Sequence, residues 1–77
     1  MFFRNVTNAI SRRPRAMDSA PRDGTHILAY LFFESSGFGE WREVYWNPFE
    51  NLWHASHPTQ AFSDDVPAAW FPLPPRP

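Results

Sequence analysis

The sequence predicts a small α+β domain in which an antiparallel meander of three or four strands packs against one N-terminal helix. Three observations lead to this class. The chain has 77 residues, enough for one modest core. Apolar residues near the N-terminus recur with helical spacing, and the later apolar runs between turn signals are typical of strands. We expect an N-terminal amphipathic helix or basic arm over residues 1–16 and a single β-rich domain over residues 17–77.

The N-terminal segment fits an amphipathic helix over residues 2–12. The apolar residues of one face recur at i, i+3 and i+7: Phe3, Val6 and Ile10. Pro14 would end this helix, because proline cannot continue it and restricts the residue before it. Residues 13–22 then form a polar linker. An arginine-bearing start with no early acid also matches a mitochondrial transit peptide, but such N-termini are common in bacterial and viral proteins, and we prefer that origin.

Two strands are expected next. Residues 26–33 are almost all apolar, which is typical of a central strand. Residues 34–40 form a loop with two glycines. Residues 41–46 form the second strand, and its alternation places three side chains on one face, Trp41, Glu43 and Tyr45, and three on the other, Arg42, Val44 and Trp46. Because both faces carry rings, at least one of them must meet the helix or the C-terminal tail.

The segment after Asn47 allows two interpretations. Asn-Pro-Phe-Glu is a good type I turn, after which residues 52–56 return as an antiparallel strand. Asparagine as N-cap with proline at N1 also begins a helix, here over residues 48–56. We prefer the strand because few residues remain before Pro58. Residues 57–67 are expected to be loop, and residues 68–73 a short edge strand or extended tail, because the surrounding prolines exclude a helix.

Charge is distributed unevenly along the chain. The net charge is −1, but residues 1–22 carry five arginines and one acid, or +4, and residues 23–77 carry two arginines and seven acids, or −5. This pattern indicates a basic arm on an acidic body. The chain contains no cysteine, which excludes disulfides and is compatible with a reducing cytosol. Its longest apolar run is far shorter than the roughly 20 residues of a membrane span.

The residues that could carry chemistry form no strong motif. Zinc would need three or four converging ligands, and the candidates are His54 and His57 with His26, Asp64 or Asp65. On a strand, positions i and i+3 point to opposite faces, so structural histidines are the preferred interpretation. Nucleophilic catalysis needs a nucleophile beside a base, and no serine or threonine lies in such a motif. We therefore predict no enzymatic activity, no metal and no cofactor.

Two kinds of binding remain. Four arginines of the arm could bind phosphates, Arg4, Arg12, Arg13 and Arg15. Exposed aromatic rings could then stack on the bases. The acidic body argues against a broad nucleic-acid surface. Protein binding is the preferred interpretation, because aromatic residues are enriched at interface cores and an acidic surface suits a basic partner. The residues expected to contact that partner are Glu34, Glu40, Glu43, Glu50, Asp64, Asp65, Trp41 and Tyr45.

Three separated motifs occur in a particular order. They are APRDGT at residues 20–25, just before the first strand, WREVYW at residues 41–46, and AWFPLPP at residues 69–75. Together they resemble a family of small bacteriophage and prophage proteins that open with APRDGT and a strand and end in Trp-x-Pro-Leu-Pro. The resemblance covers roughly residues 17–75 and leaves the N-terminal arm outside. Ala69 stands where the family pattern suggests histidine, which removes one candidate polar residue.

This resemblance implies a setting more than an activity. The family has no established activity, so no catalytic residues carry over. A mobile-element protein works in the cytoplasm of a bacterial host, where small acidic phage proteins are often inhibitors of host machinery. The resemblance thus implies a non-enzymatic inhibitor of a host protein complex, such as an anti-CRISPR or another anti-defence protein. The alternatives are a nucleic-acid binder that uses the arginine-rich arm, and a structural or homodimeric virion-associated module.

Overall fold

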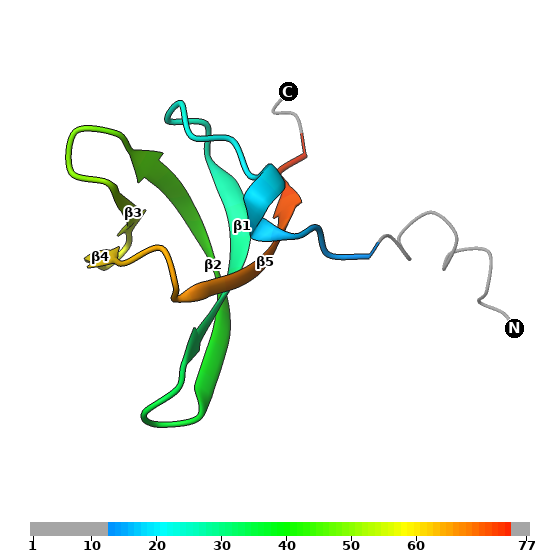
Figure 1. Cartoon of the computed structure of the whole chain (residues 1–77), viewed down its shortest axis with the longest axis vertical. Coiled ribbons are helices and arrows are strands. Elements are labelled where there is room, and N and C mark those ends of the chain that lie inside the picture. Colours follow the sequence, from blue (N-terminus) through cyan, green and yellow to red (C-terminus); the bar gives the residue numbers. More distant parts are fainter. Residues whose placement is uncertain (1–12, 75–77) are drawn as a thin grey trace, which may run out of the picture.

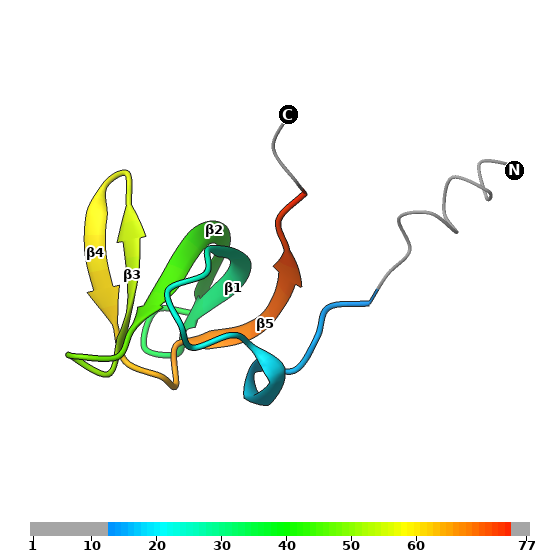
Figure 2. The same ribbon diagram turned by 90° about the horizontal axis from the view of Figure 1, so that it is seen from above.

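The computed structural model describes residues 13–74, which form one antiparallel sheet of five strands. A 3-10 turn precedes the sheet, and the elements in chain order are η1 (Met17–Ser19), β1 (Ile27–Phe33), β2 (Phe38–Asn47), β3 (Leu52–Ser56), β4 (Thr59–Phe62) and β5 (Pro67–Pro72). The strand order is β4-β3-β2-β1-β5, so the last strand returns to pair with the first (Figure 1). Seen from above, β4 and β5 are the two edges of a twisted sheet (Figure 2). No helix in this range is long and apolar enough to cross a bilayer.

The predicted α+β class is wrong, because the described part of the chain is all-β. Residues 13–74 contain no α-helix, only the 3-10 turn, and the helix expected over residues 2–12 lies outside the described residues. The prediction assumed that a helix covers one face of the sheet. In the structure the irregular segment before β1 covers it instead, with Met17 packed against the core and Ala20 buried in it.

The expected strands are confirmed with small shifts of their ends, and one strand was not foreseen. β1, β2 and β3 match the runs 26–33, 41–46 and 52–56, and β5 takes the place of the edge strand expected over 68–73. The loop expected over residues 34–40 is shorter than predicted, because β2 begins at Phe38 and pairs with the end of β1. β4 lies inside the predicted loop 57–67. Its sequence, Thr-Gln-Ala-Phe, has only one large apolar residue, so it lacks the alternation by which a strand is recognised.

The turn between β2 and β3 shows why its sequence also resembles a helix start. The Asn47 Oδ1 accepts the backbone N–H groups of Phe49 and Glu50 at 2.9 and 3.2 Å, which is what an N-cap side chain does. Asn51 then adopts a left-handed conformation with φ of 57°, which asparagine tolerates better than most residues. The chain therefore reverses after one turn, and the preference for strand over helix is confirmed.

The core lies on one face of the sheet. Register places Ile27 opposite Val44 and Trp46 opposite Trp53, so side chains of the same face meet across neighbouring strands. The buried residues of the hydrophobic core are Ala20, Ile27, Ala29, Leu31, Val44, Trp46, Trp53, Ala55, Phe62 and Trp70, and among the described residues no buried one is charged or has a polar side chain. A tryptophan buries about 150–250 Å², which lets few positions build this core.

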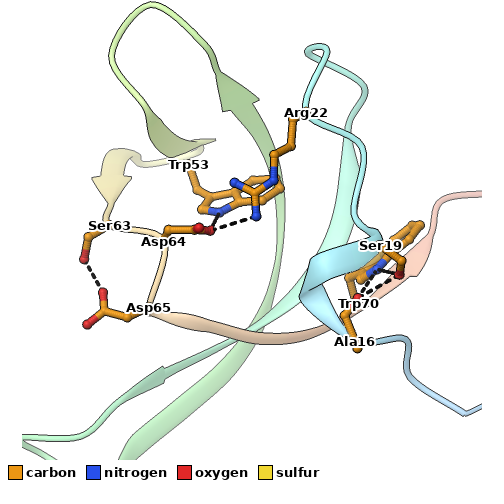
Figure 3. Close-up of polar contacts among 8 residues, drawn as sticks. All are labelled: Ala16, Ser19, Arg22, Trp53, Ser63, Asp64, Asp65 and Trp70. Atoms are coloured by element: carbon orange, nitrogen blue, oxygen red, sulfur yellow. Dashed lines mark hydrogen bonds and ion pairs between the residues drawn. The ribbon is translucent and has the colours of Figure 1, made fainter.

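Trp53 of β3 connects the sheet to two of the loops around it (Figure 3). The Trp53 Nε1–H donates to Asp64 Oδ1, in the turn between β4 and β5, at 2.8 Å. The guanidinium of Arg22 lies over the rings of Trp46 and Trp53, 4.4 and 5.3 Å from their centroids. Arg22 also forms an ion pair of 3.2 Å with Asp64. The segment before β1 is thereby attached to β2, β3 and the turn before β5.

Trp70 of β5 holds the start of the described chain. Its Nε1–H donates to the carbonyl of Ala16 and to the Ser19 hydroxyl, at 3.1 and 3.2 Å (Figure 3). Arg15 exchanges two backbone hydrogen bonds of 2.8 and 3.0 Å with Trp70, and its guanidinium lies 5.1 Å from the ring centroid. Arg15, expected in the basic arm, is thus paired with the outer edge of the sheet.

We predict that Asp64→Asn destabilises the protein at pH 7 and has less effect at low pH. Partial desolvation raises the pKa of Asp64, but hydrogen bonds from Trp53 and Arg22, with the charge of Arg22, outweigh it, so the pKa lies below its usual value. A lowered folded-state pKa gives stability that is present above the unfolded value of about 3.9 and is lost as pH falls through the folded value. Because the Asp64 side chain is 52% exposed, solvent screening reduces the effect, and urea unfolding should show a loss of about 0.5 kcal/mol at pH 7 that shrinks toward pH 2.

Asp65→Asn is the matched control. Asp65 lies in the same turn, but it accepts its hydrogen bond from Ser63 rather than from the tryptophan and arginine (Figure 3). Its substitution should cost less at pH 7. Equal losses in the two variants, or a loss in Asp64→Asn that does not change with pH, would contradict the role given to Asp64.

Candidate functional site

The side of the sheet opposite the core carries a second set of rings. Alternation along each strand sends these side chains away from the core. We call them the outer face: Leu28, Tyr30 and Phe32 of β1, Trp41, Glu43 and Tyr45 of β2, His54 of β3, Phe71 of β5, and His26 just before β1. In β2, Arg42 is in register with buried Ala29 and belongs to the opposite side. None of the outward positions in the five described strands holds an arginine.

One row of the outer face consists of Tyr45 between two histidines. Its ring is stacked on His26 and on His54, with centroids 4.7 and 5.6 Å apart. His26 Nδ1 lies 2.7 Å from Glu43 Oε2, and His54 Nε2 lies 2.5 Å from Glu50 Oε1. An ionised carboxylate only accepts hydrogen bonds, so both imidazole nitrogens donate. Each glutamate therefore orients one ring, and the row carries two carboxylates at its border.

A second row crosses β1, β2 and β5. Trp41 contacts Tyr30 and Phe71, with ring centroids 5.2 and 5.4 Å apart. The Tyr30 ring lies over Gly39, where an added Cβ would be only 2.0 Å from the tyrosine oxygen. Despite these contacts Trp41 is 42% exposed, and Phe32, further along β1, is 39% exposed. The row therefore presents large apolar surface to solvent.

Acidic side chains lie near both ends of β1. Glu34 and Asp65 line a shallow hollow together with Phe32. Glu43 lines a second hollow, which it shares with Arg42, His26 and His57. Both depressions are partly open to solvent and offer polar and apolar side chains as binding contacts.

The eight residues expected to contact a partner do not all share one surface. Glu40 is in register with buried Leu31 and so belongs to the core side of β2. Asp64 is bound to Trp53 and Arg22. The structure does bring together Trp41, Glu43 and Tyr45 on the outer face, and Glu50 reaches it through His54. Glu34 and Asp65 line the hollow beside Phe32.

Two arginines of the nucleic-acid alternative lie in the described range. Arg13 is exposed, whereas the backbone and guanidinium of Arg15 are both engaged with Trp70. Arg4 and Arg12 lie outside the described residues. Arg15 is also exposed, so the described part of the arm offers two arginines to a phosphate, one of them stacked on Trp70.

The histidines are spread over the structure. His26 and His54 flank the same tyrosine, and His57 follows β3 at an exposed position. Among residues 13–74, no three histidine or acidic side chains are placed to hold a metal ion. Imidazole, phenol, indole and carboxylate groups arranged as in the outer face can stack on a partner and accept its hydrogen bonds.

Alternation alone places Trp41, Glu43 and Tyr45 on one face, and this prediction is confirmed. Four other members of the outer face carry no sequence signal of that role: His26, Tyr30, His54 and Phe71. They reach it through strand pairing, which sets Phe71 opposite Leu28 and His54 opposite Tyr45. Pairing between distant strands is not visible in a single sequence.

We predict that Gly39→Ala displaces Tyr30 from its place beside Trp41. The new methyl group would collide with the tyrosine oxygen and ring, and overpacking of this kind costs about 1–3 kcal/mol. Urea unfolding measures the cost, and near-ultraviolet circular dichroism reports the changed ring environment.

The same substitution in a Tyr30→Ala background is the control. There the methyl group meets no ring, and alanine in a strand interior is more favourable than glycine, so Gly39→Ala should be neutral or stabilising. A cost that persists in the double variant would show that the backbone at position 39, rather than the tyrosine, requires glycine.

No protein-family model, curated protein or solved structure matches this chain. The likeness to the phage family therefore stays a prediction from three motifs.

Proposed function

We propose that this protein is a non-enzymatic binding module that attaches to another protein through its outer face. The exposed aromatic rows on that face carry the proposal. Soluble monomers rarely leave large contiguous apolar patches uncovered unless these bind something. Tryptophan and tyrosine dominate the energetics of protein interfaces because they bury much area at low entropic cost. Trp41, 42% exposed at the centre of its row, is the expected anchor.

The charges on this face favour a basic partner. Glu43 and Glu50 border the histidine row, and Glu34 and Asp65 lie in the hollow beside Phe32. A partner that presents arginine or lysine would find carboxylates to pair with and rings on which its cations can lie. The same carboxylates would repel nucleic-acid phosphates, which makes this face a poor platform for DNA or RNA.

The phage-family resemblance supplies the setting for this proposal. A basic surface in a bacterial cell is commonly one that holds nucleic acid, and an acidic, aromatic module seated on it would block access. We therefore infer that the protein inhibits a host complex, with CRISPR and other defence complexes among the candidates. Nucleic-acid binding through the N-terminal arm and assembly into a homodimer or virion are the competing roles.

Trp41→Ala should remove most of the partner from a pull-down. Tagged protein is incubated with bacterial lysate, treated with nuclease and washed at moderate salt. The wild type should retain a defined protein complex, and Trp41→Ala should retain at least about tenfold less, as expected for an interface hot spot. Phe49→Ala is the control, because Phe49 is 95% exposed in the turn between β2 and β3 and lies outside the outer face. Equal losses in both variants would contradict the proposed surface.

Charge reversal on β2 provides a second test. Glu43→Lys changes the outer face, whereas Glu40→Lys changes the opposite side of the same strand. The first should weaken retention, most strongly at low salt where unscreened charges act furthest, and the second should leave it nearly unchanged. Recovery of nucleic acid alone, lost as salt rises or when residues 1–16 are deleted, would instead establish the arm as the binding element. Recovery of the chain only with itself would establish the homodimer.

A further inference from the structure

The cation held between two tryptophans points to a binding site distinct from the outer face. We propose that Trp46, Trp53 and Asp64 form an arginine-binding site that Arg22 occupies in the unbound protein, and that an arginine from a partner peptide can take its place. Trp46 and Trp53 both belong to the core side of the sheet, and Figure 3 shows Arg22 and Asp64 beside Trp53. The proposal therefore does not rest on the function argued above.

The walls of this site are positioned without help from Arg22. Trp46 and Trp53 are paired in register on β2 and β3, with ring centroids 5.1 Å apart and planes at 67°. The carboxylate of Asp64 is oriented by the Trp53 Nε1–H at 2.8 Å. Two aromatic surfaces at a steep angle and one fixed carboxylate are thus held by the sheet and by their own hydrogen bond.

The chemistry of these walls suits a guanidinium group in particular. Its flat, weakly hydrated cation can lie against indole faces while an N–H donates to a carboxylate. Arg22 makes these contacts, at 4.4 and 5.3 Å from the two ring centroids and 3.2 Å from Asp64 Oδ1. Lysine carries a compact, strongly hydrated charge, so the site should discriminate between the two residues.

Arg22 is held mainly by its side chain, which makes exchange possible. Its side chain is 35% exposed and that of Asp64 is 52% exposed, so the site opens to solvent. Within the described part of the chain, no backbone hydrogen bond ties residues 21–25 to a strand, and the Thr25 N–H bonds only to the Asp23 side chain. The loop can therefore leave the site without breaking any strand pairing.

Tethering places Arg22 in competition with any incoming arginine. A side chain on a short loop acts at an effective concentration of about millimolar or more. A partner must therefore contribute contacts beyond the single arginine, and removal of Arg22 should reveal the intrinsic affinity of the site.

The test compares the wild type with Arg22→Ala, using Nα-acetylarginine methylamide and its lysine counterpart as probes. Binding is followed by tryptophan fluorescence and by the indole N–H resonances. Arg22→Ala should bind the arginine probe saturably, about tenfold more tightly than the lysine probe and more tightly than the wild type does. Its melting temperature should rise with the arginine probe, because only the folded state binds it.

Two further variants define the site. Adding Asp64→Asn to Arg22→Ala should abolish the preference for arginine. Arg15→Ala is the matched control, because Arg15 also lies over a tryptophan, Trp70, but over that ring alone; its removal should create no binding.

A folded Arg22→Ala protein that binds neither probe, or both equally, would overturn the proposal. If Arg22→Ala does not fold, Arg22→Lys and the wild type replace it. In them, high concentrations of the arginine probe should shift the Trp53 indole resonance more than the lysine probe does. Equal or absent shifts would likewise overturn the proposal.

Discussion

The pairing of Trp46 with Trp53 across β2 and β3 is the interaction on which the rest of the structure depends. A chain of this size buries only roughly 60% of its unfolded surface, and a single sheet leaves its apolar face open unless another segment covers it. Here the cover is an irregular segment, so side chains must attach it. Arg22 connects that segment to β2 and β3, and Asp64 connects the turn before β5 to the same point. Trp70 repeats the arrangement at the sheet edge by holding Ala16 and Ser19.

The two faces of the sheet differ in what covers them rather than in what composes them. Both carry aromatic side chains, because the strands alternate rings with other residues on each side. The core face is covered by the segment before β1, and its rings are buried. On the outer face, the rings around Trp41 support one another but keep solvent contact. The proposed function rests on this difference, because the proposed partner would contact the uncovered rings and the carboxylates that border them.

Much of the fold could be predicted from local patterns, and the failures have identifiable causes. Continuous or alternating apolar runs predicted β1, β2 and β3, because the buried positions of a strand are apolar and recur with a regular period. β4 has no such apolar pattern, because it is a short edge strand with mostly exposed residues. The α+β class was wrong because an irregular segment with a 3-10 turn covers the core in place of the expected helix. The prediction treats the acids as one surface, although Glu40 and Glu43 lie on opposite sides of β2 and Asp64 is paired with Arg22.

By itself the sequence determined the number of cysteines, the charge asymmetry, the main strands and which side chains of β2 share a face, because these depend on composition or on the period of a single strand. Only the tertiary structure decided that β5 lies beside β1, that Phe71 meets Trp41, and that Arg22 finds two tryptophans and a carboxylate. Those contacts join residues up to several dozen positions apart. Their geometry depends on which strands pair and on where the loops lie over the core, and a local sequence pattern predicts neither.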